Sequence, residues 1–311
     1  MKNRLVLLVL FVAACAVICS SVLLALDPQT GHGKPEPPMA GVHWAKGNAP
    51  GAGVGRGNKS PNLSWHGGPI MQTVEVTAIF WGPSWSETSS KVIGMDKFYK
   101  GIGNSAYATT SDEYKVGGVG PSDTINYQKH LIDNSKASGG NTTGPILTEV
   151  CKMISNPVSN GYYPVYVDLF RGNAGFCAWH SYSSCGGVPV QFAFFFNLDG
   201  DIGCDPQDTQ TGNEQGLAAV ANVSGHEISE ARSDPALNAW YDSSGDENSD
   251  KCAWSFGSDY VTFPSNDAAH PENTTKWKIQ GNWSNSAYNS TDRGYLNRSS
   301  QKGCIDGGTY N

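Results

Sequence analysis

Three ionisable residues that lie close together in the sequence suggest a metal site with its own general base. His226 and Glu230 are four residues apart, so on a helix they share one face, one turn apart. Zinc takes about four ligands, and a catalytic site leaves one position for water. Glu227 follows the first ligand and would project toward that position, where it could accept a proton from water that the metal acidifies. The segment therefore predicts a metal-dependent hydrolase with His226 and Glu230 as ligands and Glu227 as the base.

A third ligand is expected from the acidic segment "GDENSDKC" that follows the predicted helix. Glu247 is the first choice, and Asp250 is the alternative to it. With two carboxylates and one imidazole, zinc would activate water less strongly than it does with more imidazole ligands. Manganese and calcium also become suitable, because oxygen ligands outnumber nitrogen.

The same residues also fit a purely structural interpretation. Glu227, Glu230 and Arg232 could form a solvated, salt-bridged helix end. Asp234 would then cap a turn at Pro235. The small Ala, Gly and Ser residues of the helix, together with the acidic segment after it, favour the close approach of an ion. Both interpretations stay open at this level.

His180 is a further candidate, either as a ligand or as a stabiliser of an oxyanion. It lies in "GFCAWHSYSSCG", where Cys177 and Cys185 could close a short loop that presents the imidazole. A histidine in such a loop can equally be exposed and without function. The spacing predicts a Cys177–Cys185 disulfide, and the four other cysteines after the leader would then pair among themselves: Cys151, Cys204, Cys252 and Cys304.

Residues 1–26 are typical of a secretory leader. Two basic residues precede a nearly unbroken apolar run that ends at Leu26, and about 20 such residues suffice to span a bilayer. A cleaved signal peptide is expected, with an uncleaved signal anchor as the alternative. An even set of six later cysteines suits an oxidising compartment. Secretion as a glycoprotein, free of the membrane after cleavage, is expected from glycosylation triplets at Asn58, Asn62, Asn141, Asn222, Asn273, Asn282, Asn289 and Asn297.

The composition argues against a nucleic-acid partner and indicates what kind of fold the chain can form. The formal net charge is -7, whereas a nucleic-acid-binding protein needs a basic face that displaces counterions from phosphates. No nucleic-acid partner is expected. With 37 glycines and 17 prolines but 39% hydrophobic residues, the chain can bury a core while it spends much of its length in loops.

Hydrophobic patterning predicts an α+β fold: a single loop-rich domain with a mixed or antiparallel sheet flanked by a few helices. Residues 27–62 are rich in Gly and Pro and have no apolar period, so they predict an exposed linker before the domain at 63–311. Strands are expected at 73–82, 162–170 and 188–198, the last apolar enough for the centre of the sheet. Helices are expected at 86–102, 144–156 and 213–232.

The His-Glu segment and the acidic segment after it resemble the gluzincin proteases typified by thermolysin. In that family an Asn-Glu-x-x-Ser-Asp segment on a second helix supplies the third, glutamate ligand. This chain keeps Asp-Glu-x-x-Asp at 246–250 and has Glu230 where those proteases have a histidine. The resemblance implies a zincin-like arrangement around the His-Glu helix and a peptide substrate.

Two longer motifs resemble the EXORDIUM, or phosphate-induced, protein family. "LSWHGGPIMQTVEVTAIFWGPSW" resembles its N-terminal signature, and "NVSGHEISEARSDPALNAWYD" resembles its second one. Plant members generally have Asn-Pro with leucines after the His-Glu pair, and this chain is more acidic there. The resemblance implies a secreted protein of the apoplast or cell wall, with extracellular matrix or cell-wall components as partners and a growth-related or signalling role that needs no catalysis.

Overall fold

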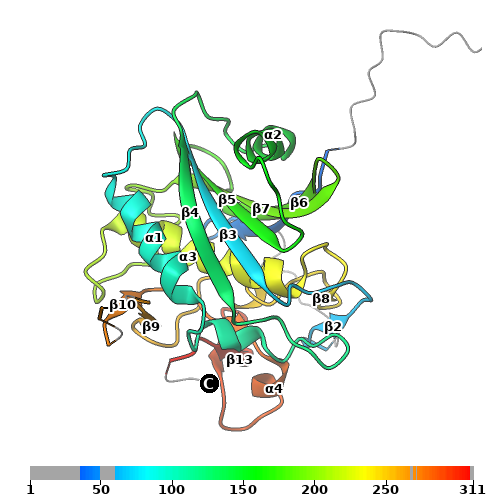
Figure 1. Ribbon diagram of the computed structural model, residues 1–311. Coiled ribbons are helices and arrows are strands. Elements are labelled where there is room, and N and C mark those ends of the chain that lie inside the picture. Colours follow the sequence, from blue (N-terminus) through cyan, green and yellow to red (C-terminus); the bar gives the residue numbers. More distant parts are fainter. Residues whose placement is uncertain (1–35, 50–59, 267–268, 271, 309–311) are drawn as a thin grey trace, which may run out of the picture. The chain divides into compact units, whose positions relative to one another are not determined.

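The computed structural model describes residues 36–49, 60–266, 269–270 and 272–308, and in them an α+β fold is built on one mixed sheet (Figure 1). This confirms the predicted fold class, and of the two sheet types the mixed one is present. From one edge to the other the strands are β1 (Ala40–Trp44), β6 (Phe176–Cys185), β7 (Val188–Asn197), β5 (Gly161–Phe170), β3 (Val74–Trp81) and β4 (Ile125–Asp133). The last four run parallel to one another, whereas β6 is antiparallel to both of its neighbours.

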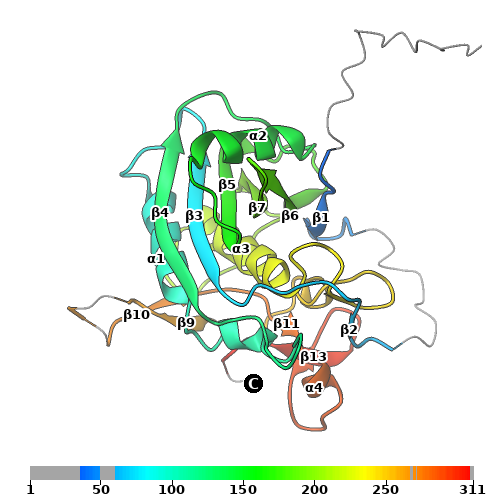
Figure 2. The same ribbon diagram turned by 45° about the vertical axis from the view of Figure 1, so that its right-hand side comes forward.

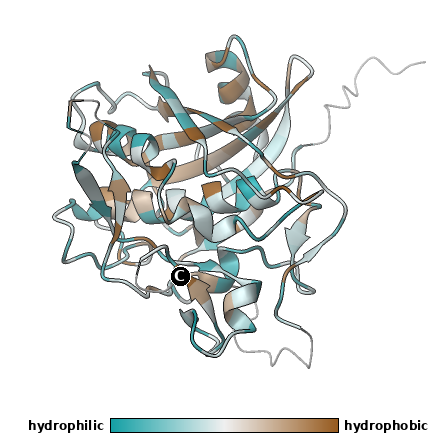
Figure 3. Cartoon of the chain, turned by 60° about the horizontal axis from the view of Figure 1, so that its bottom comes forward, coloured by the Kyte–Doolittle hydropathy of each residue, from teal (hydrophilic) through white to brown (hydrophobic). Residues whose placement is uncertain are grey.

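The centre of the sheet is apolar on both faces, as the prediction for residues 188–198 requires. On one face of β7, Phe194 stacks on Trp179. On the other face Phe195 stacks on Tyr166. A strand covered on both sides reads as a continuous hydrophobic run because neither set of alternating side chains meets water. Figure 3 shows this concentration of hydrophobic residues in the sheet and in the elements packed on it.

Three helices cover the sheet, and all three were expected from the sequence. Helices α1 (Ser90–Ile102) and α3 (Gln215–Ser233) pack against each other on one face, while α2 (Gly144–Met153) lies on the other (Figure 2). Pro145 occupies the first turn of α2, where a missing backbone N–H costs nothing. Helix α3 ends at Ser233 and is capped by Asp234, whose Oδ1 accepts hydrogen bonds from the N–H groups of Asn238 and Ala239.

Residues 40–44 correct the expectation of an exposed linker over the whole of 27–62. They form β1, which pairs with β6 at the edge of the main sheet. The sequence does not reveal this strand because it is short and contains a glycine. Its buried residues also alternate with half-buried ones rather than with exposed ones. Strand β4 at the opposite edge and β6 itself were also not expected from the sequence.

The Cys177–Cys185 disulfide predicted from the spacing is wrong. Both cysteines lie on β6, and eight residues of extended strand span roughly 26 Å, far beyond the reach of about 4.4–6.8 Å between bridged Cα atoms. Cys185 pairs instead with Cys151, and Cys177 pairs with Cys204. These two bonds fix both ends of β6. The third bond joins Cys252 to Cys304, and three disulfides suit an oxidising, extracellular environment.

Short elements from before and after α3 lie outside the main sheet. They comprise two 3₁₀ turns, η1 (Ala108–Ser111) and η2 (Asp250–Cys252), the short helix α4 (Asn285–Tyr288), and the strands β2 (Ser64–Trp65), β8 (Trp240–Tyr241), β9 (Val261–Pro264), β10 (Thr274–Trp277), β11 (Asn282–Trp283), β12 (Tyr295–Leu296) and β13 (Lys302–Ile305). Strands β11, β13 and β12 form a small antiparallel sheet. Of the helices in the described residues, none has the length and apolar character that a membrane crossing requires, and the predicted leader lies outside those residues.

Burial separates the glycosylation triplets into two groups. Asn222 and Asn282 are fully buried and Asn297 is 8% exposed, so the folded protein cannot present them to a glycosyltransferase. Asn141, Asn273 and Asn289 are exposed. Asn62 is half-buried and Asn58 lies outside the described residues. The described residues therefore leave three exposed acceptor sites rather than the full set expected from the triplets.

Candidate metal centre

The His-Glu motif lies on the buried side of α3, against the sheet. His226, Glu227 and Glu230 are each 0% exposed. Arg232 and Asp234, the other residues of the supposed solvated helix end, are each 1% exposed. The solvated interpretation is therefore wrong, because a helix end without access to water cannot use water to screen its charges.

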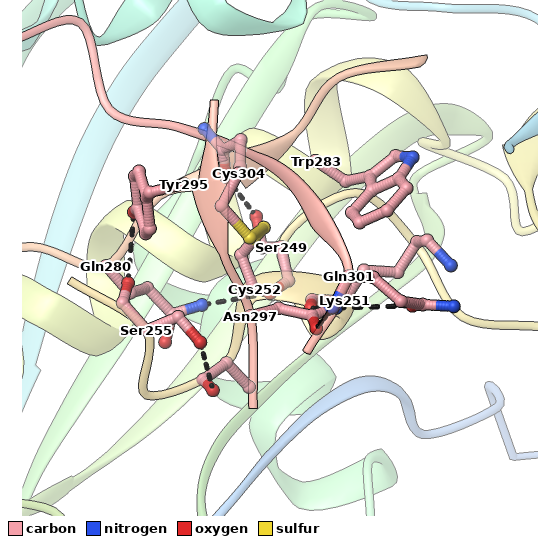
Figure 4. The surroundings of a disulfide bond; sticks show 12 residues. Ser249, Lys251, Cys252, Ser255, Gln280, Trp283, Tyr295, Asn297, Gln301 and Cys304 are labelled. Carbon is pink, nitrogen blue, oxygen red and sulfur yellow. Dashed lines mark hydrogen bonds between the residues drawn. A yellow bond between two sulfur atoms is a disulfide. The ribbon is translucent and has the colours of Figure 1, made fainter. Parts of the chain in front are cut away.

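The acidic segment after α3 is fixed to the C-terminal strands by a disulfide and by side-chain hydrogen bonds (Figure 4), and it contacts α3 through Ser249 Oγ, which donates to the His226 carbonyl. The Cys252–Cys304 bond ties η2 to β13. Asn297 donates from its side-chain amide to the Lys251 carbonyl at 2.9 Å, and the Tyr295 hydroxyl donates to the Ser255 carbonyl. These contacts fix the backbone on either side of Cys252, so the acidic residues just before it reach the helix in a defined position.

His180 reaches the cluster from β6, where it points toward α3. Its Nε2 lies 3.2 Å from Glu247 Oε2 and 3.5 Å from Glu230 Oε2. Four ligands at about 2.1 Å around a tetrahedral ion lie about 3.4 Å from one another. The imidazole therefore has the spacing to each carboxylate that two donors to one ion have, and the three donor atoms all lie within 4.8 Å of one another. His180 lies in a strand and is 0% exposed, so the exposed-loop interpretation is wrong.

The second imidazole faces the other oxygen of the same carboxylate. His226 Nε2 lies 3.1 Å from Glu230 Oε1 and 3.6 Å from Asp250 Oδ1. The backbone N–H of Asp250 also donates to Glu230 Oε1 at 2.8 Å. Glu230 is thus shared by two groups of possible donors, His180 with Glu247 and His226 with Glu227. Its Oε1 has a hydrogen-bond donor, while its Oε2 is buried without one.

Gln280 fixes which nitrogen of His226 carries a proton. The backbone N–H of Trp254 can only donate, and it donates to Gln280 Oε1. The Ser249 carbonyl can only accept, and it accepts from Gln280 Nε2. The amide orientation is therefore determined, and its NH₂ group lies 2.9 Å from His226 Nδ1. Nδ1 must accept, so the neutral imidazole carries its proton on Nε2, the nitrogen that faces Glu230.

Several carboxylate oxygens in the cluster have no hydrogen-bond partner. Both oxygens of Glu227 are buried and unpaired, as are Glu230 Oε2 and Glu247 Oε1. Such a density of unsatisfied buried acceptors is costly unless a cation or protons neutralise them. Within the described residues, the buried histidine and glutamate side chains thus form groups that can hold a metal ion.

The electrostatics of the cluster divide its acids into two kinds. Burial raises the pKa of Glu227 well above its usual range and raises that of Glu247 to about 8, although His180 opposes the shift. Burial also acts to raise the pKa of Glu230, but the facing imidazoles of His226 and His180 outweigh it and lower the value to about 2. Glu230 is therefore the carboxylate that stays ionised most readily.

Most of the sequence-predicted site residues come together, though in a different arrangement. Glu247, expected to join His226, instead contacts His180. Asp250 is the acid nearest to His226 after Glu230, and its side chain is 25% exposed. Whether His226 is itself a ligand stays a prediction. Sequence reasoning missed Gln280 and two residues of β1, Gly41 and His43, and no spacing rule marks any of them.

Comparisons with family models, curated proteins and solved structures give no match to this chain. The resemblance to the EXORDIUM family and to the gluzincins therefore stays an expectation. The functional assignment rests on the geometry of the buried cluster.

Proposed function

We propose that the chain binds one divalent cation, with zinc as the first candidate, through His180, Glu230 and Glu247. The observation that carries the proposal is the spacing around His180 Nε2, which lies 3.2 and 3.5 Å from one oxygen of each carboxylate. All three residues are between 0% and 4% exposed. An ion would neutralise charge that water cannot reach, and this offsets the repulsion of the gathered carboxylates.

In this arrangement His226 positions Glu230 and is not a ligand. Its Nε2 lies 3.1 Å from Oε1, close enough for an ion pair although the geometry does not form a hydrogen bond. The Asp250 N–H donates to the same oxygen. The second oxygen, Oε2, is left free for the ion. Partners that orient a ligand in this way commonly change metal affinity when they are removed. Manganese and calcium remain alternatives to zinc, because two of the three donors are carboxylates.

The activity proposed for this site is metal-dependent hydrolysis, with a peptide as the first substrate class to test. A divalent cation would supply Lewis-acid activation of water. Glu227 is suited to be the base because both of its oxygens lack a partner and one lies within 4.8 Å of donor atoms of His226 and Glu230. Burial raises its pKa, and a carboxylate with a raised pKa is a stronger proton acceptor once it is ionised.

Calorimetry with zinc, manganese and calcium, combined with hydrolysis of a pool of fluorescence-quenched peptides, tests this proposal. Wild type should bind one ion and cleave a member of the pool. Glu227→Gln should bind the ion equally well and lose cleavage, because a base that is not a ligand can be removed without loss of the metal. Absence of binding by the folded wild type contradicts the metal site. Equal cleavage by Glu227→Gln contradicts the role of the base.

A second candidate function is a non-catalytic extracellular protein in which the ion only stabilises the fold. The complete burial of the cluster favours it, since structural metal sites are closed whereas catalytic sites keep an open position. This function agrees with the expected role of an apoplastic or cell-wall protein. It is supported if the ion binds and raises the free energy of unfolding, but no peptide is cleaved.

A further inference from the structure

Strand β1 closes the metal centre from the side of the sheet edge. It belongs to residues 36–49, called here the N-terminal strap, which run along the outer side of β6. His43 of the strap packs on the His226 ring with centroids 4.4 Å apart. Its Nε2 also bonds to Gln280 Oε1 at 2.8 Å, and Gln280 in turn contacts His226. The strap therefore both covers the cluster and joins its hydrogen-bond network.

Gly41 makes the closest approach of the strap to the proposed ligands. A Cβ atom at this position would lie 2.1 Å from His180 Nε2 and 2.4 Å from Glu230 Oε2. The residue also has φ +48°, in the left-handed region where a side chain adds strain. Backbone without a side chain thus occupies the space directly beside the two donors, both of which are 0% exposed.

Pairing between the strap and β6 is interrupted next to the metal centre. Ala40 pairs with His180 and His43 with Ala178, so three steps on β1 oppose two on β6, and a second register shift follows at Trp44. Such bulges weaken the ladder locally. The strap is anchored on each side of the interruption, by Thr143 donating to the Pro37 carbonyl at 2.5 Å and by Trp254 Nε1 donating to the Trp44 carbonyl at 2.8 Å.

We propose that the N-terminal strap is a detachable cover of the metal centre, and that its release from β6 controls exchange of the ion and access to Glu227. The inference rests on the proposed metal site and adds its regulation. The disulfides that hold both ends of β6 leave that strand in place when the strap departs. The strap itself has no disulfide within the described residues, so it can detach without breaking a covalent bond.

The test measures how fast zinc leaves the full chain when excess 4-(2-pyridylazo)resorcinol is added. The double variant Thr143→Val, Trp254→Phe removes one hydrogen bond of the strap on each side of the interruption and no proposed ligand, and other bonds, such as that from Ser181 Oγ to the Pro38 carbonyl, remain. The matched control, Thr148→Val with Trp65→Phe, removes the bonds from Thr148 to the Gly144 carbonyl and from Trp65 to the Gly68 carbonyl. These contacts do not involve the strap.

We expect zinc release from the anchor variant to be about 10- to 30-fold faster than from wild type, since each hydrogen bond contributes about fivefold to the closed state. The control should release zinc at the wild-type rate. Equal release rates in all three proteins contradict the proposal that the strap covers the site, but not the metal site itself. A wild type that holds no zinc contradicts both proposals. If the double variant does not fold, Thr143→Val alone should show about a fivefold increase, and no increase counts against the proposal.

Discussion

On or next to each edge strand of the main sheet a histidine lies between two carboxylates, His130 on β4 and His180 on β6 beside β1, but only the site near β1 has the character of a metal centre. At the β4 edge His130 lies 2.9 Å from Asp96 and 2.7 Å from Glu87, closer than the 3.2 and 3.5 Å of the pairs around His180. There, however, Glu87 is 75% exposed, and the Tyr127 hydroxyl donates to Asp96. At the β1 edge every donor is buried and several oxygens have no partner. Residue types and distances alone therefore do not distinguish an ion site from a salt bridge; burial and unsatisfied acceptors do.

The largest expected difference between the two edges is in zinc affinity. His180→Ala removes the only imidazole among the proposed ligands and should weaken zinc binding by more than about a hundredfold, because changes to partners of a ligand already cost roughly 10- to 100-fold. His130→Ala removes a histidine in a similar charged setting and should leave the affinity unchanged. Calorimetry on both variants checks this. Equal zinc affinities of the two variants would contradict the assignment of the metal site to His180.

Two glycines with positive φ allow the crowding at the β1 edge to be measured. Gly41→Ala should lower the free energy of unfolding by about 3 kcal/mol, through both overpacking and backbone strain. Gly47, at φ +82°, has open space around its Cβ position, so Gly47→Ala should cost only the strain of about 1 kcal/mol. Urea denaturation gives both values. A Gly41→Ala variant as stable as Gly47→Ala would show that the strap does not pack closely against His180 and Glu230.

The role assigned to His226 predicts an intermediate effect. His226→Ala should weaken zinc binding about 10- to 100-fold, as expected for a residue that positions a ligand, whereas His180→Ala should have the larger effect. The order of the two affinities is the informative result. If His226→Ala abolishes binding and His180→Ala is tolerated, the ion lies on the other side of Glu230.

The smallest expected effect is the pH dependence at the β4 edge. Burial acts to lower the pKa of His130, but its hydrogen bonds to Glu87 and Asp96 prevail and raise it. A histidine with a raised folded-state pKa contributes stability below its unfolded value near 6.5, and loses this contribution as the pH rises through the folded value. Wild type should therefore exceed His130→Ala in stability by less than about 1 kcal/mol at pH 5.5, and the difference should vanish at high pH. A difference that grows with pH contradicts the ion pair.

Helices and strands with a strong local sequence pattern were predictable from the sequence. Strands that form only because they pair with other strands were not. The alternation in β3 and the stripes of α1, α2 and α3 are properties of short segments, and the structure confirms them. For β6 the sequence predicts a loop, because the spacing of Cys177 and Cys185 suggests that they pair with each other, whereas their partners lie outside the segment. The partners of a cysteine depend on the topology of the sheet, which its spacing does not contain.

The candidate site also combines contacts that the local sequence predicts with contacts that depend on the fold. The four-residue spacing of His226 and Glu230 requires only a helix, and so their proximity was predictable. His180 and Glu247 lie 67 residues apart in the chain and meet only because β6 and the segment before η2 converge on α3. Gln280 could not be identified at all, because its role depends on which backbone groups its amide contacts.

Zinc-edge X-ray absorption spectroscopy on the zinc-loaded full chain tests the central claim most directly, because it counts the imidazoles bound to the ion. The arrangement of Gln280, His226 and Glu230 predicts one imidazole, with carboxylate or water oxygens as the other donors and no sulfur. A spectrum with two imidazoles would place His226 among the ligands and contradict the protonation assigned to it. A folded protein that retains no zinc would contradict the metal centre itself.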